Sequence, residues 1–106
     1  MSDLNICIIK GRVGSAIQPR EGPGAFMCSF VVGTGERWRD KITGEPKSKT
    51  TWLKCIAWGD IGLWCMQYLK KGTEVFLTGK ITERKWQGSE GEKKSALEIQ
   101  VDKIEM

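Results

Sequence analysis

The chain has 106 residues, which is enough for one hydrophobic core and therefore one domain over residues 1–106. Seventeen Lys and Arg against 13 Asp and Glu give a net charge of +4, a modest bias toward polyanionic partners. The absence of histidine excludes Ser-His-Asp triads, histidine general bases and the usual histidine ligands of zinc. We therefore expect no catalytic residue, no cofactor and no metal site.

The four cysteines form no Cys-x-x-Cys pair, and each lies in an apolar stretch: Cys7, Cys28, Cys55 and Cys65. This pattern indicates reduced thiols in a core rather than zinc ligands or disulfides. The start of the chain has no basic stretch before its apolar run, and no apolar run approaches the ~18 residues that a membrane helix needs. We expect a cytoplasmic protein.

The first half of the chain predicts three strands. In residues 4–13 both alternating faces are apolar, which is typical of a strand buried between two layers. Residues 15–24 are rich in Pro and Gly and predict a loop, and residues 25–34 predict the second strand. Residues 36–50 are polar and predict a hairpin tip. Residues 51–58 predict the third strand, with Trp52, Lys54, Ile56 and Trp58 on one face.

After the third predicted strand, the spacing of apolar residues changes from that of a strand to that of a helix. Apolar residues at helical spacing predict a short amphipathic helix over residues 61–70, ended by Gly72 with lysines at its C-terminus. Residues 73–81 and 96–104 predict two further strands, joined by a charged, protruding hairpin over residues 82–95. Three strands, a helix and two strands predict an all-β, five-stranded OB-fold barrel with one short helix between strands 3 and 4.

Tryptophan placement is the strongest functional signal. Trp38 stands between Arg37 and Arg39, and Trp86 directly follows Arg84 and Lys85, in polar segments that would not bury an indole. Unpaired bases stack on such rings at about 1–3 kcal/mol each, while Lys and Arg neutralise the adjacent phosphates. The pattern favours a single-stranded nucleic acid as the partner.

The other three tryptophans are weaker candidates for base stacking. Trp52 and Trp58 flank Lys54 on one predicted strand face, about 20 Å apart, and could stack on bases or instead pack on the barrel. Trp64 lies on the apolar stripe of the predicted helix, which favours a place in the core.

Several motifs in order resemble bacterial-type single-stranded DNA-binding proteins over nearly the whole chain. The matching segments are residues 5–13 (NICIIKGRV), 38–40 (WRD), 43–45 (TGE), 51–52 (TW), 58–59 (WG), 68–72 (YLKKG) and 84–86 (RKW). The resemblance implies sequence-independent binding and protection of single-stranded DNA in replication, recombination and repair.

The resemblance also implies roles for particular residues. Base stacking is implied for Trp38, Trp52, Trp86 and for Trp58, where the family commonly has Phe. Phosphate contacts are implied for Arg39, Lys54, Lys71, Arg84 and Lys85. A homotetramer, with a dimer as the alternative, is implied through the first strand: Asn5, Ile6, Cys7, Ile8 and Ile9.

Two departures from the family pattern bear on these expectations. Leu53 stands where the family often has histidine near the subunit interface, which bears on tetramer packing. The family's flexible tail with an acidic tip is not in this sequence, as in a truncated chain or a short phage or mobile-element member. Partners recruited by that tail are therefore not expected.

Two alternatives stay open at this point. An RNA-binding OB module of the cold-shock type uses the same stacking and charge. A primosomal or adaptor OB protein would use the barrel surface for protein contacts, although tryptophans in basic segments argue against it.

Overall fold

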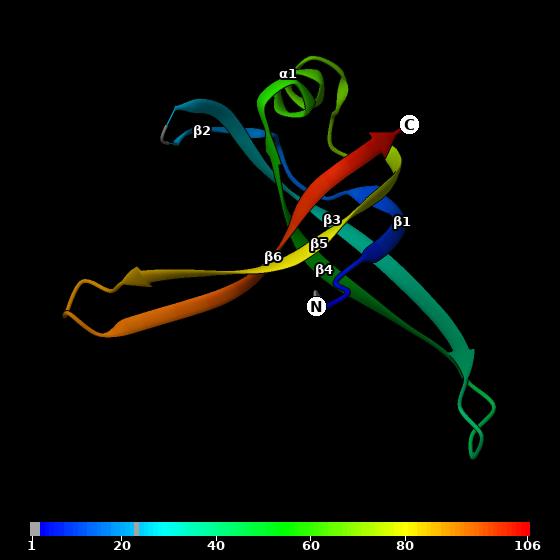
Figure 1. Ribbon diagram of the computed structural model, residues 1–106. Coiled ribbons are helices and arrows are strands. Elements are labelled where there is room, and N and C mark those ends of the chain that lie inside the picture. Colours follow the sequence, from blue (N-terminus) through cyan, green and yellow to red (C-terminus); the bar gives the residue numbers. More distant parts are fainter. Residues whose placement is uncertain (1–2, 23) are drawn as a thin grey trace.

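The computed structural model describes residues 3–22 and 24–106, in which a helix caps a small barrel with two projecting arms (Figure 1). The elements of this described part are β1 (Cys7–Val13), β2 (Gln18–Gly22), β3 (Ala25–Arg39), β4 (Pro46–Trp58), α1 (Gly59–Tyr68), β5 (Glu74–Gln87) and β6 (Lys93–Glu105).

Five strands close into a ring. The order β1-β5-β6-β4-β3 is completed by pairing of β1 with β3, so the expected five-stranded barrel with its helix between the third and fourth barrel strands is confirmed. Two of the contacts in the ring are short. β1 meets β3 through Arg12–Gly33 and Val13–Val32, and β4 meets β6 in parallel through Cys55–Ile99 and Ile56–Gln100.

The expectation of a plain loop over residues 15–24 is wrong, because this segment contains β2. β2 pairs antiparallel with β3, with Gln18 opposite Ser29 and Pro19 opposite Cys28. A proline is tolerated there since β2 lies at a sheet edge, where one row of N–H groups needs no strand partner. The chain passes from β1 to β2 along the same edge of β3, where the N–H of Gly14 donates to the carbonyl of Val31 (2.8 Å).

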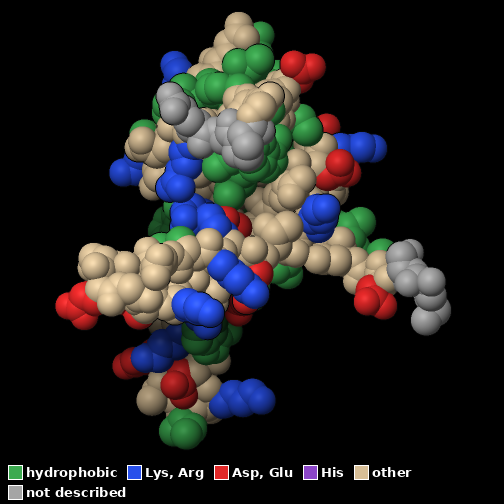
Figure 2. Space-filling view, turned by 60° about the vertical axis from the view of Figure 1, so that its left-hand side comes forward, with side chains coloured by type: hydrophobic (Ala, Val, Ile, Leu, Met, Phe, Trp, Pro, Cys, Tyr) green, Lys and Arg blue, Asp and Glu red, His purple; other side chains and the backbone are tan. Residues whose placement is uncertain are grey.

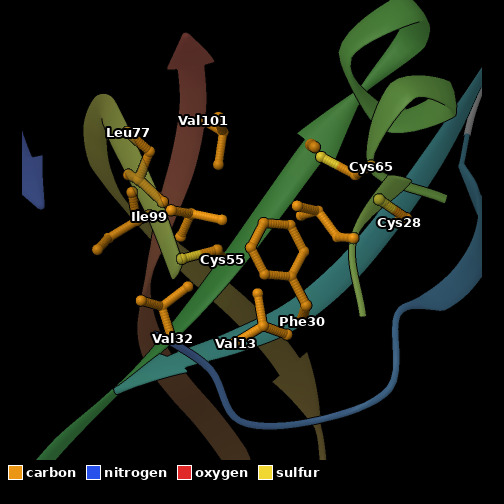
Figure 3. Packing of buried hydrophobic residues seen from close by; sticks show 12 residues of the cluster. Val13, Cys28, Phe30, Val32, Cys55, Cys65, Leu77, Ile99 and Val101 are labelled. Carbon is orange, nitrogen blue, oxygen red and sulfur yellow. The ribbon is translucent and has the colours of Figure 1, made fainter. Parts of the chain in front are cut away.

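The core fills the ring beneath α1 (Figure 3). Phe30 lies at its centre among valines, leucines and isoleucines of the surrounding strands. Cys28, Cys55 and Cys65 are fully buried free thiols, as expected, and Cys7 is half-buried. Burial raises the pKa of the Cys55 thiol to about 12, so it packs as a neutral, small apolar group.

Two hairpins extend far beyond the barrel as arms. β3 and β4 stay paired out to Arg39–Pro46, and β5 and β6 stay paired out to Gln87–Lys93. Residues 36–50, expected as a hairpin tip, are therefore largely strand, and residues 82–95 form the protruding hairpin that was expected. The arms give a radius of gyration of 16.3 Å, against about 13 Å for a compact domain of this length.

The helix begins and ends earlier than predicted. It spans Gly59–Tyr68, and the N–H of Leu69 closes its last turn on the carbonyl of Cys65 (3.0 Å). Lys70 and Lys71 lie beyond the helix, which corrects the expectation of lysines in its last turn. Trp64 is half-buried and packs against the core, with its ring 5.5 Å from that of Tyr68.

Among the described residues, no helix combines the length and the apolar character that crossing a bilayer requires.

The first strand has one uncovered face. Cys7 and Ile9 pack against the core, but Ile6 and Ile8 are 61% and 65% exposed, so the expectation of a strand buried on both sides is wrong for the single chain. No other layer of the described chain covers this outer face. Beyond the strand's start, the Asn5 amide pairs with the backbone of Ile81, donating to its carbonyl (2.7 Å) and accepting from its N–H (3.0 Å).

Candidate nucleic-acid interface

Trp52 packs closely against two glycines. It stands opposite Gly33 on the neighbouring strand, and Gly14 approaches the same ring from the turn after β1. A Cβ added at Gly14 or Gly33 would lie 2.2 or 2.6 Å from Cζ3 of Trp52, closer than carbon atoms can approach. The absence of side chains at both glycines thus makes room for the indole, while 61% of the Trp52 side chain stays exposed. The arrangement offers a solvent-facing aromatic surface.

The exposed indole borders a hollow of about 470 Å³, called here the Trp52 hollow, together with Lys10, Arg12 and Glu74. Arg12 donates to the carbonyl of Gly72 (3.1 Å), and both cations lie near the Glu74 carboxylate, at 3.6 Å for Arg12 and 3.9 Å for Lys10. Two cations and one anion leave a net positive charge beside the ring. Lys10 and Arg12 are therefore candidate phosphate contacts that the sequence analysis missed.

Trp38 lies near the tip of the β3–β4 arm and is 48% exposed. It borders a second hollow of about 490 Å³, the Trp38 hollow, with Arg37, Arg39 and Lys47. Because Trp38 and Gly33 are five residues apart on one strand, period-two alternation places Trp38 and Trp52 on opposite faces of the arm.

A tight turn fixes the tip of this arm. The N–H groups of Ile42 and Thr43 donate to Oδ1 of Asp40 (2.8 and 3.1 Å), which lowers the pKa of that carboxyl below its ordinary range. Nη1 of Arg39 donates to the carbonyl of Gly44 (3.0 Å). The same turn thus holds Arg39 next to the Trp38 hollow.

Trp86 lies on the other arm and is 39% exposed. The guanidinium of Arg84 lies over its ring, with Cζ 4.5 Å from the centroid, a cation–π contact. Trp86 also borders a third hollow of about 600 Å³, the Trp86 hollow, with Lys85, Lys93 and Lys94. Three lysines therefore border this hollow, and a fourth cation lies over the ring itself.

A buried carboxylate lies between the arms. Oε2 of Glu98, on β6, is 3.1 Å from Nζ of Lys54 on β4 and 3.1 Å from Nε of Arg84 on β5. The side chain of Glu98 is 2% exposed, whereas those of Lys54 and Arg84 are 31% and 36% exposed. Lys54 and Arg84 therefore both contact the buried Glu98 carboxylate and extend from it to the surface.

Within the described chain, four predicted residues border none of the Trp52, Trp38 and Trp86 hollows: Lys54, Trp58, Lys71 and Arg84. Lys54 and Arg84 contact Glu98, and Arg84 also lies over the Trp86 ring, whereas Trp58 and Lys71 lie elsewhere. Trp58 is half-buried opposite Met27 and immediately precedes α1, and Lys71 is exposed in the turn between α1 and β5. Their predicted DNA contacts stay predictions.

Positive side chains gather where the arms leave the barrel, with acidic ones interspersed (Figure 2). All three hollows are wide enough for a ligand, given that binding sites commonly measure about 300–1,000 Å³. Over residues 3–22 and 24–106 the structure contains no cluster of three or more Cys, Asp or Glu side chains able to hold a metal ion.

Some site residues escaped the sequence analysis. Lys47, Lys93 and Lys94 become neighbours of tryptophans only because strand pairing brings the two sides of each arm together. Pairing the two sides of residues 36–50 and of residues 82–95 as hairpins would have placed these lysines beside the tryptophans. The sequence did not mark Glu98 as a site residue, since a single acidic residue in an apolar strand usually has its side chain in solvent.

Comparisons with known proteins agree with this geometry. The sequence model described as the Single-strand binding protein family matches residues 4–106. A solved structure described as a Plasmodium falciparum SSB complex with ssDNA superposes with a TM-score of 0.82 at 32% sequence identity. The match covers 99% of this chain and 94% of that one.

Proposed function

The chain belongs to the single-strand binding protein family, and from that membership we propose that it binds single-stranded DNA without sequence preference, stacking bases on its exposed tryptophans. The observation that carries the proposal is that Trp38, Trp52 and Trp86 each combine an exposed ring with a hollow lined by Lys or Arg. The solved structure with which the chain superposes is itself described as a complex with ssDNA.

The chemistry of binding needs no reaction. An indole presents a flat face that every base can stack on, so affinity is largely independent of sequence. Lys and Arg beside each ring neutralise phosphates and release counterions, so affinity falls as salt rises. Duplex DNA hides the faces of its bases and offers only its phosphates, so it binds less tightly.

The path of the strand follows from where the rings lie. Trp52 and Trp38 are on opposite faces of one arm, and Trp86 is on the other arm. A single flat platform cannot present all three, so the bound strand bends around the arms. Arg39, Arg84 and Lys85 lie next to rings along this path, and Arg12 and Lys10 join them.

We further propose that the chain self-associates through β1, as a tetramer or a dimer. The support is the uncovered apolar face that carries Ile6 and Ile8, since large exposed aliphatic side chains in a row commonly mark an interface. Coating of unpaired strands in replication, recombination and repair is the cellular role that we propose.

The test is a titration of intrinsic tryptophan fluorescence with oligothymidine, at low and high salt, with matched duplex DNA and oligouridine as competitors. We expect strong, saturable quenching that weakens with salt and is not reversed by duplex. Equal competition by duplex would contradict the proposal, and tighter binding of oligouridine would favour an RNA-binding module.

A further inference from the structure

We propose that Glu98 is a positioning residue of the DNA site: its buried carboxylate holds Lys54 and Arg84 together as a two-cation phosphate site beside Trp86. This inference rests on the proposed single-stranded DNA binding. The three residues come from three neighbouring strands, β4, β5 and β6, so the site lies where the two arms meet.

The geometry keeps two like charges close. Each nitrogen lies 3.1 Å from the same oxygen, so Nζ of Lys54 and Nε of Arg84 are at most about 6 Å apart. Without an anion between them the two cations would repel and turn toward water. Glu98 thus fixes a pair of positive groups that would otherwise separate.

Both cations keep donors for a second anion. Glu98 engages only Nε of Arg84, so the two Nη groups can still donate to a phosphate oxygen. The ammonium of Lys54 carries three donors and forms an ion pair with Glu98 at 3.1 Å. Since both side chains are about one-third exposed, a phosphate can reach them from solvent without displacing the carboxylate.

The same contact sets the position of Trp86. The guanidinium that Glu98 holds by Nε lies 4.5 Å above the Trp86 ring. Arg84 therefore covers one face of the indole, so a base would stack on the opposite face. Glu98 acts on the DNA site through Arg84 and Lys54, with its own side chain only 2% exposed.

The proposal makes a prediction opposite in sign to simple electrostatics. Glu98→Gln removes a negative charge from a site for a polyanion, which by charge alone would tighten DNA binding. If Glu98 positions the cations, the variant instead binds oligothymidine about fivefold more weakly. The slope of log affinity against log salt also becomes shallower by up to about 0.7, the value for one lost phosphate contact on a single strand.

Glu83→Gln is the matched control. Glu83 lies on β5 one residue from Arg84, pairs with exposed Lys85 at 3.4 Å, and its loss changes net charge by the same amount. It should leave oligothymidine affinity unchanged or slightly higher. Glu98→Gln matching this control in affinity and in salt slope would overturn the proposal.

A double-mutant cycle separates positioning from general damage to the fold. In an Arg84→Ala, Lys54→Ala background, Glu98→Gln should have no further effect on affinity, because its two partners are gone. An undiminished loss in that background would show that Glu98 acts by another route. Wild-type protein that failed to bind oligothymidine would instead refute the proposed function itself.

A second measurement covers the case in which Glu98→Gln does not fold. Lys54→Ala and Arg84→Ala, combined, should cost clearly less than the product of their separate losses in affinity, since both contact one phosphate. Multiplicative losses would overturn the two-cation site.

Discussion

The indole of Trp52 lies on the backbone of Gly33, its partner across the β3–β4 ladder, so closely that a methyl group on Gly33 would be 2.6 Å from Cζ3 of the ring. The glycine thereby sets the height and tilt of an aromatic surface. The relationship predicts that the DNA site is sensitive to a residue that never touches DNA.

Gly33→Ala should displace the Trp52 indole and weaken oligothymidine binding by about 1 kcal/mol, the lower end of the stacking contribution of one base. Gly35→Ala is the matched control. Gly35 borders the same hollow on the same strand, but an added Cβ there would meet nothing within 4 Å. Fluorescence titration of both variants checks the prediction, and equal losses would contradict it.

Alanine at Trp38, Trp52 or Trp86 should each weaken binding by about 1–3 kcal/mol, because each removes one stacking surface. Trp64→Phe should leave affinity unchanged, since Trp64 packs on the core and against Tyr68. Isothermal titration with oligothymidine measures the losses. Trp58→Ala tests the family-derived role of that ring, and its folding must be verified by a thermal melt, since Trp58 is half-buried.

Arg12→Ala should weaken binding and make the salt slope shallower by about 0.7, the change expected for one lost phosphate contact on a single strand. The reason is its place beside Trp52 in the same hollow. Lys103→Ala removes the same charge from a hollow shared with Trp64 and Ile61 instead. An identical slope change in both variants would mean that net charge, and not position, governs binding.

Ile8→Glu should disrupt self-association, because it places a charge beside exposed Ile6, at the apolar start of the outer face of β1. Sedimentation velocity should show a shift toward monomer with the barrel still folded. Ile42→Glu adds the same charge at the tip of an arm, where the side chain is 95% exposed, and should leave the oligomeric state unchanged. A monomeric wild-type chain would contradict the interface.

The turn at the tip of the β3–β4 arm should loosen in acid. The two N–H donors lower the pKa of Asp40 in the folded chain, so its contribution is complete above the ordinary value of 3.8 and is lost as the pH falls through the lowered value. Amide chemical shifts of Ile42 and Thr43 should therefore titrate below pH 3.8. Asp40→Asn should abolish this titration, and a midpoint above 3.8 would contradict the assignment.

Local pattern was enough to predict the barrel and the exposed tryptophans. The alternation of residues along the third predicted strand placed Trp52 and Lys54 on one face. The polar residues around Trp38 and Trp86 predicted that both side chains are exposed. β2 was missed because its Pro and Gly are typical of loops, and an edge strand tolerates them. The outer face of β1 was misjudged, since the apolar pattern of a strand does not show whether another layer covers that face.

Contacts between remote segments were beyond the sequence. Nothing in the order of residues shows that Gly14 and Gly33 both contact the Trp52 indole, because that depends on the pairing of β3 and β4 and on the turn after β1. The anchoring of Lys54 and Arg84 on Glu98 likewise depends on three strands in register.

The closure of the ring has a consequence for how the protein folds. Each long hairpin starts from residues close in sequence at its tip, whereas Cys55 with Ile99 and Ile9 with Leu77 join segments that are 44 and 68 residues apart. Closing those intervals costs chain entropy before many contacts compensate for it. We expect the two hairpins to form first and ring closure to limit the folding rate, so the slowest step lies in the barrel, away from the arms that carry Trp38 and Trp86.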